Sequence, residues 1–147
     1  MKLDGTVTIE APRQEVWDFL VDINSVSQCV PGLESIEVVV PDEKFKLQAS
    51  VGLGTVNVKF DAEVEWLDLD PPNRARMKGH GTAPGSAGDA TAEMVLTEGP
   101  EGTTIMDWTA DVMVSGTIAS LASRLMGGAA KRLTASFFDC VKDHVES

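Results

Sequence analysis

Between residues 56 and 66 the chain alternates between apolar and polar side chains. In VNVKFDAEVEW every even position is apolar and every odd position is polar or charged. A period of two predicts a β-strand with one buried face and one wet face. Similar runs recur from Leu33 to Val114, separated by turn sequences such as DPPN and APGSAG. The pattern predicts an antiparallel meander, preceded by a first strand around Val7.

Two other segments follow a helical period. In residues 12–23, PRQEVWDFLVDI, apolar side chains recur at steps of three and four after a proline, which the first turn of a helix tolerates. A longer apolar stripe runs through residues 116–147 and predicts a long C-terminal helix across the sheet. Gly127 and Gly128 in its middle indicate a bend or a close approach, because each costs about 1 kcal/mol relative to alanine.

Length and charge narrow the class of protein. A chain of 147 residues suits one domain with its own core, and we expect a single domain over residues 1–147. The net charge of −11 argues against nucleic acid as a partner, since that binding needs clustered Lys and Arg. The sequence shows no signal-peptide pattern and no apolar run near the roughly 20 residues of a membrane span. We therefore expect a cytoplasmic protein.

The two cysteines are expected to be reduced and structural. Cys29 and Cys140 lie far apart, without CxxC or Cys/His metal spacing. Cys29 precedes a Pro-Gly pair, which ends a helical turn and accepts unusual backbone angles, so we expect it to shape a corner. A nucleophilic thiol would need a base and an orienting group, and His80 and His144 lie in no recognisable motif.

The sequence also lacks patterns typical of catalysis and metal binding. It contains no GxGxxG, P-loop or HExxH motif. The acidic residues of the predicted strands fall at outward positions, so paired carboxylates in a dry pocket are not indicated. We expect no enzymatic activity, no catalytic residue, no metal and no covalently held cofactor.

Small residues face one another across the predicted core. Glycine and alanine recur in RARMKGHGTA, in the strand after it and in the MGGAA segment of the last helix. Because interiors normally fill to crystal-like density, the helix either approaches the sheet closely or leaves a cavity of roughly 300 to 1,000 Å³. The predicted ligand-binding residues are Val51, Val58, Phe60, Met77, Gly79, Ala92, Met94, Trp108, Val112, Ile118, Leu121, Leu125, Met126, Ala129 and Leu133.

A basic patch interrupts the acidity of the chain. No Asp or Glu occurs from Val112 to Phe138, whereas Arg124, Lys131 and Arg132 lie on the predicted helix. Exposed basic residues contribute about 1 kcal/mol each at an anionic bilayer surface. These three are therefore the predicted membrane-facing residues, and a solvated helix face without a partner is the alternative.

Three segments resemble a known family. APRQEVWDFLVDINSVSQCVPGLESIE, GTAPGSAGDATAEM and GGAAKRLTASFFDCV are together similar to the CoxG family of carbon monoxide dehydrogenase subunits, almost end to end. The cysteine shortly before Pro-Gly and a strand is the most specific part. The resemblance implies an α+β fold of the START-related helix-grip (SRPBCC) class. That fold has a curved antiparallel sheet, here of about six to seven strands, around a long C-terminal helix, with two short helices after the first strand.

The same resemblance implies a function. CoxG proteins connect carbon monoxide dehydrogenase, a soluble molybdenum enzyme, to the cytoplasmic membrane, and the family is linked to respiratory quinone. We therefore expect a non-enzymatic carrier, peripheral at the inner face of the cell membrane, that binds menaquinone, ubiquinone or lipid in an apolar cavity. One alternative is a packed-core adaptor that recruits the dehydrogenase without binding a ligand. Another, a cyclase or hydrolase of the wider class, would require polar groups at inward positions.

Overall fold

A computed structural model describes residues 1–146, and Ser147, the last residue of the predicted domain, lies outside the described residues. Its strands form one seven-stranded antiparallel sheet in the order β1-β7-β6-β5-β4-β3-β2. The strands are β1 (Lys2–Ile9), β2 (Leu33–Val40), β3 (Lys44–Leu53), β4 (Val56–Asp70), β5 (Arg74–Ala83), β6 (Ser86–Glu98) and β7 (Thr104–Gly116). The predicted meander is confirmed, with β1 added beside β7.

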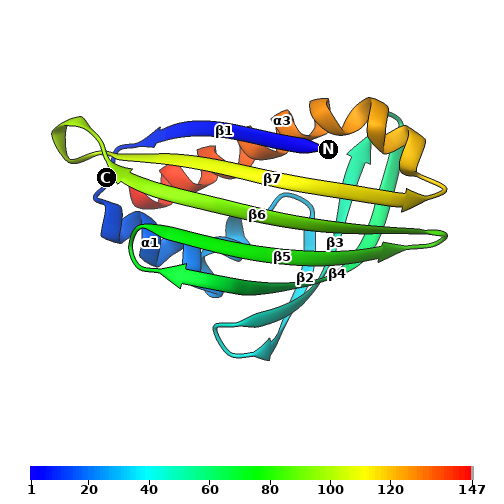
Figure 1. The fold of residues 1–147 in the computed structure, drawn as a ribbon, viewed down its shortest axis with the longest axis horizontal. Helices are drawn as coiled ribbons and strands as arrows, with labels where there is room; N and C mark the ends of the chain where they lie inside the picture. The colour runs from blue at the N-terminus through cyan, green and yellow to red at the C-terminus, as the bar shows by residue number, and fades with distance from the viewer. Residues whose placement is uncertain (147) are drawn as a thin grey trace.

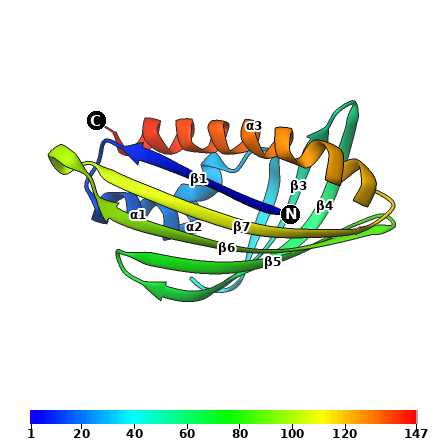
Figure 2. The ribbon, with the colours of Figure 1, turned by 45° about the horizontal axis from the view of Figure 1, so that its top comes forward.

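The helices other than η2 lie on one face of this curved sheet (Figures 1 and 2). They are α1 (Arg13–Val21), α2 (Ile23–Val26), the 3-10 helix η1 (Ser27–Cys29) and α3 (Ala119–Val145). The 3-10 helix η2 (Pro100–Gly102) lies in the connection between β6 and β7. Asp22 separates α1 from α2, because its backbone is extended and its side chain accepts a hydrogen bond from the backbone N–H of Asn24. Figure 2 shows α3 running along the sheet with its C-terminal end near α1. This arrangement confirms the predicted helix-grip fold.

The register of the sheet separates a solvent-exposed face from a face that packs against the helices. Phe45 pairs with Val64, and both point toward the helices. On the outer face, the Lys44 ammonium lies 3.0 Å from the Glu63 carboxylate. The hydrogen bond from Lys44, helped by its charge, holds the pKa of Glu63 below its usual range. The predicted alternation of apolar and charged positions is thus confirmed on β3 and β4.

The chain turns a sharp corner between η1 and β2. Cys29 ends η1, and Gly32 has φ +76°, in the left-handed region that favours glycine. A Cβ at Gly32 would collide with the backbone carbonyl oxygen of Ser50. The predicted corner after Cys29 is confirmed, because only glycine fits between this turn and β3.

Two core clusters lie under the two halves of α3. The α1 cluster contains Ile9, Ala11, Val16, Trp17, Leu20, Cys29, Ala75, Met94, Leu96, Met106 and Val141. The β3–β4 cluster contains Leu53, Val58 and Ala129, with Val51, Ala83, Ile118, Leu121, Leu125 and Met126 packed against them. A Cβ added at Gly127 or Gly128 would meet nothing within 4 Å. Of the two alternatives predicted for these glycines, a bend or a close approach, the close approach is wrong, and the helix meets the sheet through Ala129 instead.

Candidate ligand-binding cavity

A cavity of about 460 Å³ lies between the C-terminal half of α3, the α1–α2–η1 segment and the inner face of the sheet. Helical residues on its wall are Leu20, Val21, Ile23, Val26, Ser27, Leu133, Thr134, Phe137 and Phe138. The rest of the wall is Val30, Pro31, Leu33, Ile36, Phe45, Leu47, Val64, Trp66, Ala75, Met77, Ala92, Glu93, Met94, Met106, Trp108 and Thr109. The volume falls within the usual range for small-molecule sites.

Side-chain size explains why this half of the helix leaves space. Phe137 and Phe138 lie on α3 with ring centroids 5.1 Å apart, edge to face, and both line the cavity. Trp66 and Trp108 stand on the opposite wall and pack against the same α1 cluster. Bulky rings on both walls hold the helix away from the sheet, because interior side chains do not overlap. The space between them is the cavity.

The cavity reaches the surface along β2, the edge strand of the sheet. Ile36 lines the cavity and is also 36% exposed, so the wall at this residue opens to solvent. Val38 lies two residues further on the same face, where it pairs with Phe45, and is 47% exposed. An apolar row therefore borders the opening, which is unusual for an edge strand in contact with water.

Two of the four polar residues on the wall, Thr134 and Glu93, are engaged elsewhere, and the other two are Ser27 and Thr109. The Thr134 hydroxyl donates to the backbone carbonyl of Ala130 at 2.8 Å. The Glu93 carboxylate accepts from the Arg74 guanidinium at 2.9 Å, and this hydrogen bond lowers the pKa of Glu93. Neither group offers an acid or base to a molecule in the cavity. The mainly apolar wall is suited to holding an apolar molecule by burial.

The predicted ligand-binding residues divide into three groups. Those that line the cavity are Met77, Ala92, Met94, Trp108 and Leu133. Those in the β3–β4 cluster are Val51, Val58, Ile118, Leu121, Leu125, Met126 and Ala129. Phe60 and Gly79 border grooves outside the cavity, and Val112 is half-buried on β7. Ligand contact by any of them stays a prediction.

One expected contact is wrong. The prediction that small residues of the last helix and the sheet face one another placed Leu125 and Ala129 opposite Met94, Ala92 and Val112. In the structure Leu125 and Ala129 pack on β3 and β4, while Met94 belongs to the α1 cluster. The sequence interpretation also missed the α1–α2–η1 and β2 part of the wall, including Ile23. Its only signal was the apolar stripe of residues 12–23, which shows that this segment packs on something without showing what.

The three predicted membrane-facing residues are exposed on α3. The Arg132 guanidinium donates to the backbone carbonyl of Gly52 at 3.2 Å, which fixes it beside the β3–β4 turn. Arg124 and Lys131 lie on the same helix. No helix within residues 1–146 is long and apolar enough to cross a membrane.

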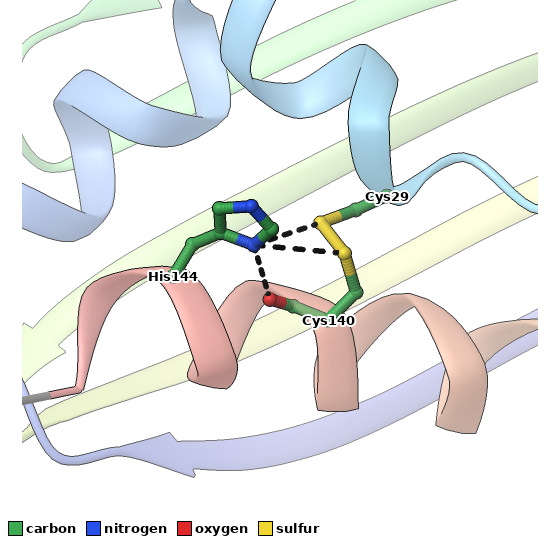
Figure 3. Close-up of side chains that lie close together, drawn as sticks. All are labelled: Cys29, Cys140 and His144. Atoms are coloured by element: carbon green, nitrogen blue, oxygen red, sulfur yellow. Dashed lines mark hydrogen bonds between the residues drawn. A yellow bond between two sulfur atoms is a disulfide. The ribbon is translucent and has the colours of Figure 1, made fainter.

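The two cysteines are joined in a disulfide, so the expectation of reduced thiols is wrong for this structure (Figure 3). Cys29 and Cys140 are 111 residues apart, and their Cα atoms lie 5.4 Å from each other. Sequence spacing could not reveal the pair, because the fold alone brings η1 against α3. The His144 ring lies beside both sulfurs. The atoms of these three residues that could coordinate a metal ion lie within 4.8 Å of one another, but the two sulfurs are bonded to each other in the disulfide.

Comparison with solved structures identifies the fold. A conserved protein from Geobacillus kaustophilus is 27% identical, with a TM-score of 0.90 over 99% of this chain and 95% of that chain. A Streptomyces aromatase/cyclase is 18% identical, with a TM-score of 0.75 over 99% of this chain and 93% of that chain. A START superfamily protein from Mycobacterium smegmatis is 12% identical, with a TM-score of 0.70 over 99% and 97%. The last two share the fold alone.

Comparison of the sequence gives the family. No curated protein sequence matches the chain significantly. The family model for CoxG, which is described as a carbon monoxide dehydrogenase subunit, matches residues 5–146. This match covers almost the whole chain, including η1, the corner before β2 and α3. The chain therefore belongs to the CoxG family of carbon monoxide dehydrogenase subunits.

Proposed function

We propose that this protein is a non-enzymatic carrier of a hydrophobic ligand that serves carbon monoxide dehydrogenase. Membership of the CoxG family supports the link to the dehydrogenase. The observation that carries the proposal is the apolar cavity of about 460 Å³ under the C-terminal half of α3. Such a cavity favours an apolar ligand, because moving apolar surface out of water stabilises the complex by about 25 cal/mol per Å² of buried area.

The proposed guest is a respiratory quinone, with menaquinone first and ubiquinone or another lipid as alternatives. A soluble dehydrogenase cannot reach a quinone whose prenyl tail lies in the bilayer, so a carrier that shields the tail from water would connect the two. Trp66, Trp108 and Phe137 on the wall offer flat faces against which a quinone ring can stack. The opening along β2 would let the rest of a long tail leave the cavity.

Loading would take place at the inner face of the cytoplasmic membrane. The exposed apolar row of Ile36 and Val38 borders the opening, where it can meet the acyl chains directly. Arg124, Lys131 and Arg132 on α3 would orient the protein on anionic lipid without anchoring it.

The second candidate is an adaptor that recruits the dehydrogenase to the membrane without carrying a ligand. The charged outer face of the sheet favours it, because that face presents groups such as Asp61, Asp89 and Asp111 to a partner. The adaptor was expected to have a packed core. The cavity therefore favours the carrier, and the two candidates differ in one measurable property, ligand uptake.

The test is extraction of menaquinone from liposomes of neutral and anionic phospholipid. Purified protein is separated from the vesicles, and bound quinone is measured by mass spectrometry after solvent extraction. Ala92→Phe places a ring in the cavity and should abolish uptake. Thr91→Phe is the matched control, because Thr91 is the adjacent residue on the exposed face of β6 and should leave uptake unchanged.

The outcomes separate the candidates. Uptake by the wild type and Thr91→Phe, with none by Ala92→Phe, supports the carrier. Equal uptake by all three would place the quinone outside the cavity. If no form takes up quinone or lipid, while the protein still brings carbon monoxide dehydrogenase to the vesicles, the adaptor replaces the carrier.

A further inference from the structure

The disulfide joins two walls of the cavity. Cys29 ends η1, directly before Val30, which lines the cavity. Cys140 lies on α3, three residues after Phe137, which lines it from the helix. Cys29 is buried, whereas Cys140 is half-buried and the neighbouring His144 is exposed. A reagent in solution therefore reaches the disulfide from the Cys140 side.

Nδ1 of the His144 imidazole lies beside both sulfurs of the disulfide (Figure 3). This Nδ1 lies 2.9 Å from the backbone carbonyl oxygen of Cys140. A carbonyl oxygen only accepts, so Nδ1 is the donor in this hydrogen bond. The same nitrogen is 3.8 Å from the Cys29 Sγ and 3.7 Å from the Cys140 Sγ. Phe19 packs on the ring, with centroids 5.3 Å apart, and holds it in this position.

We propose that Cys29, Cys140 and His144 form a thiol–disulfide exchange site, and that its reduction releases α3 from the α2–η1 wall of the cavity. The co-reactant is a small dithiol or a protein dithiol of the cell. The consequence for the cavity rests on the proposed carrier function, whereas the exchange chemistry does not. Disulfides in a reducing cytoplasm are typically transient, catalytic or redox-sensing, which agrees with an exchange role at the proposed location.

The exchange proceeds in two balanced steps. A thiolate of the dithiol attacks the Cys140 Sγ, the S–S bond breaks, and its electron pair leaves on the Cys29 Sγ. That sulfur takes the proton from Nδ1 of His144, while the ring takes up a proton from water at Nε2. The second thiol of the reductant, deprotonated by water, then displaces Cys140 as a thiolate, which water protonates. The protein gains two thiols, and the dithiol becomes a disulfide.

The chemical part is tested by the rate at which dithiothreitol reduces the folded protein. Samples are quenched with N-ethylmaleimide in denaturant, and the number of maleimide groups on the protein is measured by mass spectrometry. The wild type should carry no maleimide before reduction and two afterwards. His144→Gln should be reduced roughly tenfold more slowly, since it lacks the proton donor. His80→Gln is the matched control, because His80 bonds Asp89 on the outer face of the sheet and should leave the rate unchanged.

The structural part is tested by hydrogen exchange with and without dithiothreitol. Reduction should speed amide exchange in η1 and in residues 133–145 of α3, while residues 119–129, held by the β3–β4 cluster, serve as the internal control. The double variant Cys29→Ser/Cys140→Ser should exchange its amides at the rates of the reduced protein, and dithiothreitol should not change those rates. Both readouts work without a ligand, so their failure is distinct from failure of the carrier proposal.

Four results would overturn the inference. One is two maleimides on the protein before reduction, which would mean that the thiols are free. The second is equal reduction rates for the wild type and His144→Gln, and the third is equal hydrogen exchange in the oxidised and reduced protein. The fourth is stoichiometric Zn²⁺ binding by the reduced protein that blocks reoxidation, because two thiolates and an imidazole would then be a metal site instead.

Discussion

The two halves of α3 meet the sheet in different ways. In the packed half, residues 119–129, the small side chains Ala122 and Ala129 are 2% and 1% exposed, and the helix lies close to β3 and β4. In the hollow half, residues 130–145, Phe137 and Phe138 face the tryptophans of the sheet across a cavity of about 460 Å³. The comparison teaches that small residues let a helix pack directly on a sheet, whereas large residues on both sides keep the two apart and leave space between them.

The same comparison explains why the cavity lies at one end of the molecule. The hollow half has a further wall, formed by α1, α2 and η1, which the packed half lacks. These segments cover the side of the space and join it to α3 through the disulfide. A helix held on bulky side chains and covered on one side by a second layer leaves a void, which here opens to water along β2.

The largest expected effect comes from overpacking the packed half. Ala129→Phe should lower the free energy of unfolding by about 1 to 3 kcal/mol, because no space is available for a ring beside Leu53 and Val58. Urea denaturation followed by circular dichroism measures the change. Ala135→Phe, at an exposed position on the same helix, is the control and should have little effect. A stable Ala129→Phe protein would show that the packed half also contains space.

The surface of the packed half is tested by charge reversal. Arg124→Glu should weaken binding to anionic liposomes by at least about 1 kcal/mol, and the wild-type binding should fade with added salt because exposed charges are screened. Vesicle sedimentation at several salt concentrations measures both. Lys59→Glu makes the same change of charge on β4 and should leave binding intact. Binding that does not depend on salt concentration would indicate that apolar side chains insert into the bilayer, with Ile36 and Val38 as the contact.

A smaller effect is expected from the glycines of the packed half. Gly127→Ala should raise the free energy of unfolding by up to about 1 kcal/mol, because alanine favours the helix and its Cβ would meet nothing within 4 Å. Thermal unfolding measures the gain. A loss of stability would mean that α3 needs flexibility or a close partner at this position, contrary to the packing described.

The smallest effect on stability is expected in the hollow half. Ala92→Phe should change the free energy of unfolding by less than about 0.5 kcal/mol, because the ring enters existing space beside Met77. The same urea measurement as for Ala129→Phe gives a direct comparison of the two ends. If both variants lose equal stability, the hollow half is as tightly packed as the other.

The sequence by itself determined the elements, the faces of the strands and the family. Alternation over residues 56–66 predicts a strand with Phe60 and Val64 on one side and Glu63 on the other, because side chains of a strand alternate with a period of two. The corner at Gly32 also depends on local backbone preferences. Such features need only neighbours along the chain. The break at Asp22 was not predicted, because the apolar stripe of residues 12–23 continues across it.

The tertiary structure alone decided where the cavity lies and which atoms meet across it. The height of α3 above the sheet depends on which large side chains face one another, and those of α3 and β7 are far apart in sequence. Sequence interpretation placed the cavity beside Ala129, where small residues instead let the helix pack down. The disulfide was hidden for the same reason, since Cys29 and Cys140 become neighbours only when η1 packs on α3. Both outcomes depend on non-local packing, which periodicity along the chain does not encode.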